Sequence, residues 1–543
     1  MQWQAVRGSA HWAAYGDALG FITELTDTDG VRRRTGHEEV ATTVPWKRRV
    51  GGRYGRDMPL PAGAYSDDTQ LRLATSRAIR GDGEFDAEAF SKIELVAWQA
   101  YALGAGRGTK AAANGLMRVD AKWSQNIFAT KAARYTDIGG NGAAMRIQPH
   151  VWSARDLTDW DTITRDVVRN AVSTHGHPRG ILGAVLHALL LAQTLATGTV
   201  PGPDQWRLTI DWLGHVPDVI DKDEELAYLW LPSWTQASGT DLRTATAAVA
   251  EECHAATAEF DPSAPLDRDN YAGLVDHLGG FANETRGSGT ITTLLAAMLA
   301  FGHAETPEAG LQLAANTLGS DTDTIATMAG ALLGAFTTSP APGPIQDDKY
   351  LDTEARRLWE ISQGGTTTTF AYPDLLRWSP PRATLDLVGR TEAGPALAGL
   401  GLLRAGAPSI GPQATYVWGS LPFGQNVLVR AREDLKPLAP HLLPPERRHL
   451  RNRRAEDAMR DQTPLFETSE TAGQQPPERG DRPPRHAASL EDTVRELRQH
   501  GFPPEEVGRA LLNLINSDRY GAEKAAVFVG LLTQAHHHGG DRR

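Results

Sequence analysis

The chain of 543 residues contains a single cysteine, Cys253. An intrachain disulfide and a cysteine metal cluster are therefore excluded, and no disulfide partner is expected. Such sparse use of cysteine is typical of proteins that work in a reducing compartment, so the sequence favours a cytoplasmic location. We expect Cys253 itself to be a buried, inert thiol.

An excess of basic residues and a long hydrophobic run are also missing. The chain has 66 acidic and 55 basic residues, a formal charge of −11, which argues against a surface broadly built for nucleic acid and leaves room only for a local basic patch. The most apolar stretch, residues 181–195, contains His187 and Gln193 and is short for a membrane span. We therefore expect a buried helix there and no membrane partner. Residues 1–20 lack the apolar core of a secretory signal.

Residues 8–340 are rich in Ala, Leu and Gly and repeat their apolar positions with a helical period. This pattern predicts a compact all-α domain with few strands, one of them around 40–44. The expected helices cover 9–19, 67–80, 87–103, 164–173, 179–195, 242–259, 290–301, 307–317 and 322–336.

Residues 341–543 differ from this domain in composition and in the pattern of apolar residues. Residues 341–440 predict a small mixed or β-rich unit of unknown role, with a short helix at 353–362 and a hairpin formed by 414–418 and 426–432. Residues 441–485 are dense in Pro, Arg, Glu and Gln and indicate a solvated linker. Residues 486–536 predict a small three-helix unit with helices at 490–500, 504–515 and 522–535, a candidate docking site for a partner.

Two acidic clusters, more than 250 residues apart, each open an apolar helix. They are Ser66-Asp67-Asp68-Thr69 and Ser320-Asp321-Thr322-Asp323-Thr324. Each cluster alone is explained by helix capping, because hydroxyls and carboxylates satisfy the first amides and favour the positive end of the helix dipole. If the two helix starts meet in space, they form an all-oxygen pocket of the kind that Mg²⁺ or Mn²⁺ prefers.

Several glycine-rich segments add to this pattern. Residues 139–146 form a loop with free amides that suits close contact with phosphate or sugar, and residues 104–109 form a shorter one. The second loop lacks the Lys-Ser/Thr ending of a nucleotide-triphosphate loop. The glycines of residues 16–20 are expected to close the first helix, with Glu24 four residues further on. Each segment alone is equally consistent with an ordinary loop or helix end.

Taken together and in this order, the segments resemble the ADP-ribosylglycohydrolase family, over residues 8–338. The resemblance rests on five short motifs: Gly16-Asp17-Ala18-Leu19-Gly20 with Glu24, Ser66-Asp67-Asp68-Thr69, Gly140-Asn141-Gly142-Ala143-Ala144-Met145-Arg146, Thr174-His175-Gly176-His177-Pro178, and Gly319-Ser320-Asp321-Thr322-Asp323-Thr324. Ser320 stands where many members have a second glycine. The loop 104–109 carries no acid, unlike that of some relatives, which leaves the acceptor linkage open.

The resemblance implies a compact all-α fold with a two-metal centre, usually Mg²⁺ or Mn²⁺, below an ADP-ribose cleft. The residues at metal-ligand positions are Ser66, Asp67, Asp68, Asp321, Asp323 and Thr324. The positions that the family uses in catalysis are Glu24, Asp67 and Asp323, with Glu24 a mobile glutamate over the metals and ribose. The expected ADP-ribose contacts are Gly106, Arg107, Gly108, Thr109, Gly140, Asn141, Gly142, Ala143, Met145, Arg146 and His175.

The expected function is that of a metal-dependent hydrolase that removes ADP-ribose from a protein side chain or a nucleic acid by cleaving the bond at the anomeric carbon. Two other functions stay open: a catalytically silent ADP-ribose-binding module, and a metal hydrolase that acts on another nucleotide-ribose or a phosphoester.

Overall fold

The computed structural model describes residues 1–52, 55–131, 133–337, 339–445, 489–515 and 521–537. The chain divides into two compact units. The first comprises Met1–Phe370 with Pro380–Leu438, and the second comprises Ala371–Ser379 with Ala439–Arg543. The linker predicted over 441–485 lies almost entirely outside the described residues.

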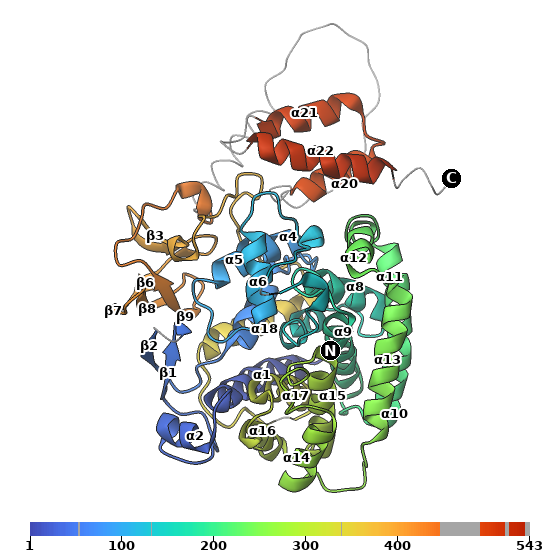
Figure 1. Cartoon of the computed structure of the whole chain (residues 1–543), viewed down its shortest axis with the longest axis vertical. Coiled ribbons are helices and arrows are strands. Elements are labelled where there is room, and N and C mark those ends of the chain that lie inside the picture. The colour runs from blue at the N-terminus through green and yellow to red at the C-terminus, as the bar shows by residue number, and fades with distance from the viewer. Residues whose placement is uncertain (53–54, 132, 338, 446–488, 516–520, 538–543) are drawn as a thin grey trace, which may run out of the picture. The chain divides into compact units, whose positions relative to one another are not determined.

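Two glycine-bearing helices lie side by side at the centre of the first unit, α1 (Trp3–Thr23) and α17 (Thr322–Phe336) (Figure 1). A Cβ atom on Gly16 would lie 2.2 Å from the carbonyl oxygen of Ala326, and one on Gly20 would lie 2.3 Å from that of Thr322. Only glycine permits so close an approach of two backbones. The expectation that these glycines end the first helix is therefore wrong, because α1 continues to Thr23 and uses them for packing.

The α1–α17 pair is surrounded by helices that complete the apolar core. The neighbouring α9 (Pro178–Thr197) is long and apolar enough to span a membrane by composition, but 83% of its most apolar window is buried in the fold, as the sequence led us to expect. Cys253, on α13 (Leu242–Ala258), is also buried, and burial raises the pKa of its thiol to about 12.

The other helices of the first unit are α2 (Thr28–Thr35), α3 (Asp67–Ala78), α4 (Ala87–Ala89), α5 (Leu95–Trp98), α6 (Arg107–Leu116), α7 (Gln148–Trp152), α8 (Trp160–Ala171), α10 (Pro203–Trp212), α11 (Val216–Lys222), α12 (Leu231–Ser238), α13 (Leu242–Ala258), α14 (Arg268–His277), α15 (Gly289–Gly302), α16 (Pro307–Asn316) and α18 (Asp348–Ser362). The all-α prediction thus holds for the large domain. The single helix expected over 87–103 is instead α4, a π-helical turn at Phe90–Glu94, and α5.

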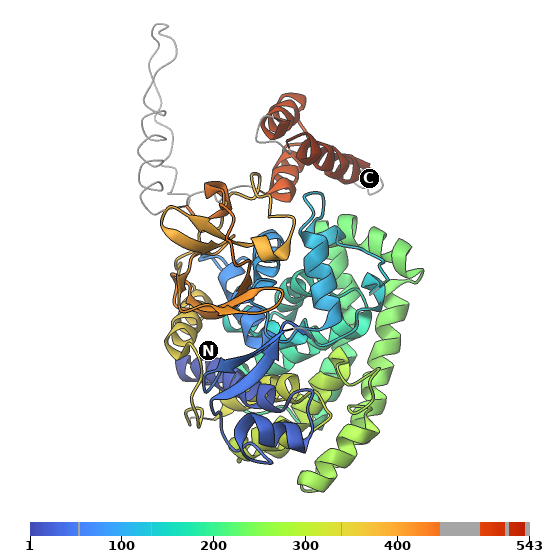
Figure 2. The same cartoon turned by 60° about the vertical axis from the view of Figure 1, so that its left-hand side comes forward.

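Small antiparallel sheets accompany the helices. The strand expected around 40–44 lies later, as β1 (Trp46–Val50), which pairs with β2 (Arg56–Leu60). Farther along the chain, β3 (Val388–Thr391), β4 (Gly394–Leu397) and β5 (Gly401–Leu402) form one sheet, and β8 (Thr415–Ser420) pairs with β6 (Arg404–Ala405), β7 (Ser409–Ile410) and β9 (Asn426–Ala431). The β8–β9 pair confirms the predicted hairpin. The β1–β2 hairpin lies beside these later strands (Figure 2).

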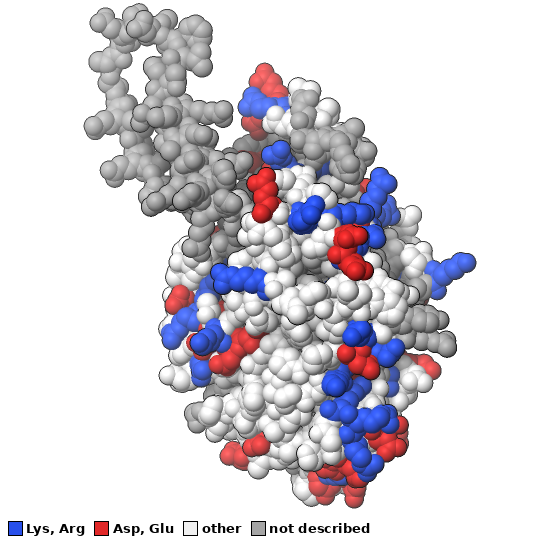
Figure 3. Space-filling view, turned by 90° about the vertical axis from the view of Figure 1, so that its left-hand side faces the viewer, with Lys and Arg blue, Asp and Glu red and all other residues white. Residues whose placement is uncertain are grey.

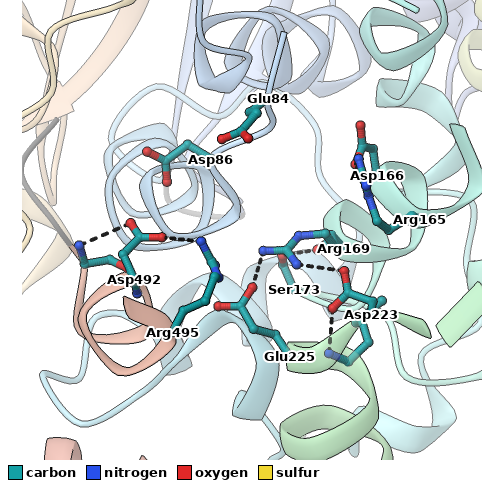
Figure 4. Close-up of polar contacts among 12 residues, drawn as sticks. Glu84, Asp86, Arg165, Asp166, Arg169, Ser173, Asp223, Glu225, Asp492 and Arg495 are labelled. Carbon is teal, nitrogen blue, oxygen red and sulfur yellow. Dashed lines mark hydrogen bonds and ion pairs between the residues drawn. The ribbon is translucent and has the colours of Figure 1, made fainter. Parts of the chain in front are cut away.

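Buried ion pairs tie the elements of this unit together. The Arg77 guanidinium on α3 donates to both carboxylate oxygens of Glu94, at 2.7 and 2.8 Å, and also to Gln425 Oε1 at 2.8 Å and to the Tyr350 hydroxyl at 3.2 Å. On α8, Arg169 lies between Asp223 and Glu225 and donates to both carboxylates (Figure 4). Because breaking such a pair leaves a buried charge without compensation, these contacts fix α3 and α8 firmly.

The second unit contains α20 (Leu490–Gln499), α21 (Pro504–Ile515) and α22 (Gly521–His537), close to the predicted three-helix unit. Its first helix begins with a capping box. Ser489 accepts a hydrogen bond from the Asp492 amide, and the Asp492 carboxylate accepts one from the Ser489 amide. This reciprocal arrangement satisfies two amides that a helix start otherwise leaves unpaired.

Candidate functional site

The first acidic cluster begins helix α3 and is anchored by helix α1. Ser66 is the N-cap and accepts a hydrogen bond from the Asp68 amide at 3.2 Å, as its sequence predicts. The fully buried carboxylate of Asp17 accepts from the amides of Ser66 and Thr69, each at 2.9 Å. The capping work is therefore shared between Ser66 and Asp17, so capping does not account for Asp67 and Asp68.

The second cluster begins helix α17, next to the end of α1. Gly319 takes a left-handed backbone conformation (φ +92°), and the Ser320 hydroxyl donates to the Thr317 carbonyl at 2.7 Å. Asp321 stands at the N-cap without a side-chain capping bond and instead accepts from Asn141 Nδ2 at 2.8 Å. Asp323 accepts a hydrogen bond from the neighbouring amide of Thr324 at 2.9 Å.

The two clusters meet in one cavity of about 730 Å³. The close contact of Gly20 with Thr322 and Asp323 joins the helices at this end, so that acids from α3 and α17 face the same space. Of the residues singled out from the sequence, those that line the cavity are Glu24, Asp67, Asp68, Gly106, Arg107, Gly108, Thr109, Gly140, Asn141, Gly142, Met145, His175, Asp321, Asp323 and Thr324. Ser66, Ala143 and Arg146 do not line it.

The four carboxylates of the two clusters, which form the buried floor of the cavity, repel one another. Burial, followed by the charge of Glu24, raises the pKa of Asp67 to about 7. Burial and the neighbouring carboxylates also raise the pKa values of Asp68 and Asp323 well above the ordinary range. The charge of the buried Arg72 opposes the rise of the Asp68 pKa, yet its guanidinium donates hydrogen bonds to Gln148, to the Met145 carbonyl and to the Thr327 hydroxyl rather than to an acid.

The residues present suit a hard cation. Asp68 Oδ2 is buried without a hydrogen-bond partner, and the surrounding donors are oxygens whose shared negative charge a divalent ion would relieve. Within the described residues, no three His, Cys, Asp or Glu side chains are already arranged to hold an ion. A shared ion would therefore use the hydroxyl of Thr324, which lines the cavity, or would require a change of carboxylate rotamer.

The loop before α6 packs against Asp67. Gly104 and Ala105 both have positive φ angles, +97° and +85°, and the Ala105 amide donates to Asp67 Oδ1 at 2.7 Å. A left-handed alanine is uncommon and costs energy, so the surrounding structure must hold it. The bend places the first turn of α6, beginning at Arg107, on the cavity wall.

The second glycine loop forms the opposite wall. Its backbone is tied to the start of α15, because the Asn141 amide donates to the Gly287 carbonyl at 2.8 Å and the Gly289 amide donates to that of Gly139 at 2.9 Å. Burial, followed by the nearby Arg146 charge, lowers the pKa of His175 to about 3, so its imidazole is neutral at physiological pH.

Arg146 supports this loop from behind. Its fully buried guanidinium donates to Asn170 Oδ1 at 2.8 Å, to the Gly142 carbonyl at 3.0 Å and to the Thr174 hydroxyl at 2.9 Å. The structure therefore places Arg146 as a brace for the loop and for Thr174, the neighbour of His175, rather than on the cavity surface.

Sequence reasoning missed several residues that shape the site. Asp17 was seen only as part of a glycine motif, yet it caps α3 from another helix. Arg48 and Arg286, which line the cavity, were not singled out. Arg48 lies on a strand whose position was itself mispredicted, and no local pattern marks either arginine.

The raised pKa values predict an unusual pH dependence of stability. Between the ordinary carboxyl value of 3.8 and about 7, the folded protein binds more protons at Asp67 than the unfolded chain does. The unfolding free energy of the metal-free protein should therefore fall as pH rises through this interval. Each unit of difference between the folded and unfolded pKa values corresponds to about 1.4 kcal/mol, so Asp67 should account for a fall of up to a few kcal/mol. Denaturant unfolding with chelator at pH 5 and 7.5 checks this. Asp67→Asn should flatten the dependence, and equal slopes in both proteins would contradict it.

The model of the family described as ADP-ribosylglycohydrolase matches residues 4–341, more than half of the chain. Among solved structures, an "ADP-ribosylglycohydrolase-related protein complex" is similar at 21% sequence identity with a TM-score of 0.41, covering 66% of this chain and 98% of that one. No curated protein matches the chain significantly.

Proposed function

Because the chain belongs to the ADP-ribosylglycohydrolase family, we propose that it is a metal-dependent hydrolase that releases ADP-ribose from a modified protein side chain or nucleic acid. The bond to be cleaved joins the anomeric carbon of the ribose to the acceptor. Its cleavage passes through oxocarbenium-like positive charge on the sugar. A floor of carboxylates beneath the sugar suits that charge.

The observation that carries the proposal is the meeting of the two acidic clusters in one cavity. Asp67 and Asp68 enter from α3, Asp321 and Asp323 enter from α17, and all four line the same space of about 730 Å³. A cavity of this size accommodates a nucleotide-sized ligand. If these acids served only to cap their own helices, the two helix starts would not need to lie at the same cavity.

Each group has a role in the proposed reaction. The metal-binding set is Ser66, Asp67, Asp68, Asp321, Asp323 and Thr324, and two Mg²⁺ or Mn²⁺ ions held there would supply Lewis acidity toward the ribose hydroxyls and a water. Glu24 lies close enough to raise the pKa values of Asp67 and Asp323, and it would bind the ribose or transfer a proton. The amide-rich loops around Gly106 and Gly140 would bind the phosphates and the distal sugar.

The decisive experiment is incubation with arginine-, serine- and DNA-linked ADP-ribose, with Mg²⁺ and with chelator. We expect free ADP-ribose from at least one linkage, in the presence of the metal only. Release of phosphate in place of ADP-ribose would point to a phosphoester hydrolase. Tight binding of ADP-ribose without any product would point to a binding module, and either result would overturn the proposal.

A further inference from the structure

Segment 380–438 contacts the β1–β2 hairpin through several specific bonds. Trp418 Nε1 donates to the Pro59 carbonyl at 3.1 Å, and Arg56 Nη1 donates to the Ile410 carbonyl at 2.7 Å. The Tyr416 hydroxyl lies against Gly51, where an added Cβ would approach it to 1.8 Å. The hairpin is thus held between the helical core and this later segment (Figure 2).

The outer face of this region carries charges of both signs. Figure 3 shows basic and acidic side chains interspersed on the face that bears the strands. Arg49 on β1, for example, pairs with Asp57 on β2 at 3.4 Å, and Arg32 pairs with Glu38. The face shown in Figure 3 therefore forms no field of one sign that would attract a ligand by charge.

On the inner side of the hairpin, the Arg48 side chain lines the cavity. Trp46 is buried edge-on against Phe21, with ring centroids 5.2 Å apart, and the Arg48 guanidinium lies 4.2 Å from the centroid of the same Phe21 ring. From there Arg48 Nη2 donates to Glu24 Oε2 at 2.6 Å. The two side chains are only 14% and 16% exposed, so solvent screens this ion pair little.

Because Glu24 lies near other carboxylates, its negative charge requires a cationic partner. Its charge acts on Asp67, Asp321 and Asp323, all of which repel a further carboxylate. Arg34 holds only the backbone at this point, donating to the carbonyls of Ile22 at 2.6 Å and Glu24 at 3.0 Å. The side chain of Glu24 therefore depends on Arg48 for its orientation on the cavity wall.

We propose that segment 380–438 is a functional part of the active site, because it braces the hairpin whose Arg48 positions the carboxylate of Glu24. Arg48 is then a positioning residue, which acts on turnover through Glu24. This inference rests on the proposed function, in which Glu24 contacts the ribose or transfers a proton.

A double-mutant cycle tests the inference on whichever ADP-ribose linkage the wild type cleaves. Groups that transfer protons contribute a hundredfold or more, so the misplacement of Glu24 in Arg48→Ala should lower kcat by at least about tenfold with a smaller change in KM. Arg48→Lys keeps the charge without the planar fork and should recover part of the loss. In a Glu24→Gln background, Arg48→Ala should cost nothing further, because both changes remove the same interaction.

The brace is tested by Trp418→Phe combined with Arg56→Gln, which removes two hydrogen bonds from the hairpin to segment 380–438. We expect a smaller fall in kcat that also disappears in the Glu24→Gln background. Arg49→Ala is the matched control, since Arg49 is the next residue on β1, is 53% exposed and pairs with Asp57 on the surface. It should keep wild-type kcat.

The outcomes separate cleanly. Independent losses from Arg48→Ala and Glu24→Gln, wild-type kcat in Arg48→Ala, or an equal loss in Arg49→Ala would each overturn this inference while leaving the proposed function in place. A wild-type protein that releases no ADP-ribose from any linkage would overturn both. Should Arg48→Ala melt before it can be assayed, Arg48→Lys and the Trp418→Phe/Arg56→Gln variant carry the same comparison.

Discussion

Asp68→Asn should abolish ADP-ribose release and at the same time raise the melting temperature of the metal-free protein. Asp68 is 2% exposed, one of its oxygens has no partner, and its charge is opposed by Asp17, Asp67 and Asp321. Asparagine keeps the shape, removes the repulsion and can donate to a neighbouring carboxylate. We expect a gain of a few degrees in melting temperature.

The activity of Asp68→Asn should fall by more than about a hundredfold, because even the partners behind metal ligands are worth 10- to 100-fold. Mg²⁺ should also stabilise the variant less than it stabilises the wild type. Both effects are measured by ADP-ribose release and by thermal melting with Mg²⁺ or chelator.

Asp241→Asn provides the matched control for this change. Asp241 caps α13 away from the cavity, and hydrogen bonds from Thr244 lower the pKa of its carboxyl. Its replacement should therefore reduce stability and spare activity, the opposite of Asp68→Asn on both counts. If Asp68→Asn also lowered the melting temperature and left turnover intact, the role of Asp68 would be structural and not catalytic.

Gly20→Ala should damage stability and activity together. The added methyl would meet the Thr322 carbonyl oxygen at 2.3 Å and the Asp323 Cα at 2.5 Å, and both are backbone atoms that cannot rotate away. Overpacking of a core costs about 1–3 kcal/mol, and here the helices must separate at the point where the two acidic clusters meet. Denaturant unfolding and ADP-ribose release measure the two effects.

The same substitution at Gly273 is the control. Gly273 lies on α14, where an added Cβ would contact nothing within 4 Å, so Gly273→Ala should stabilise that helix by up to about 1 kcal/mol and leave activity unchanged. A Gly20→Ala protein with wild-type stability would show that the α1–α17 contact is looser than the structure indicates.

The local signals in the sequence were sufficient for some elements and not for others. Helix α17 begins and ends at the residues predicted for it, because its acidic start is followed by an apolar run that only Thr327 interrupts. Helix α1 was cut short, since the role of Gly16 and Gly20 depends on a helix more than 300 residues away. The polar helix α2 has no apolar stripe and gave no signal.

The candidate site divides in the same way. The acids and loop glycines were found because their types and order are visible in the sequence, and the cavity brings most of them together. The roles of Asp17 and Arg48 could not be predicted from the sequence, because each depends on a contact between distant segments. Asp17 contacts the start of α3, and Arg48 contacts Glu24. A pattern within one segment contains no information about such a contact.

The contacts of Arg77 bear on where this protein can be cut. The family match ends at residue 341, yet two of the groups that accept hydrogen bonds from Arg77, Tyr350 and Gln425, come later in the chain. A polypeptide truncated at residue 341 would lack two of the four oxygen atoms that accept hydrogen bonds from the buried Arg77 guanidinium. It would also lack α18, which packs against α3. We therefore expect a fragment that keeps both of these acceptors, and with them the buried contacts of α3, to extend at least to Gln425, well past residue 341.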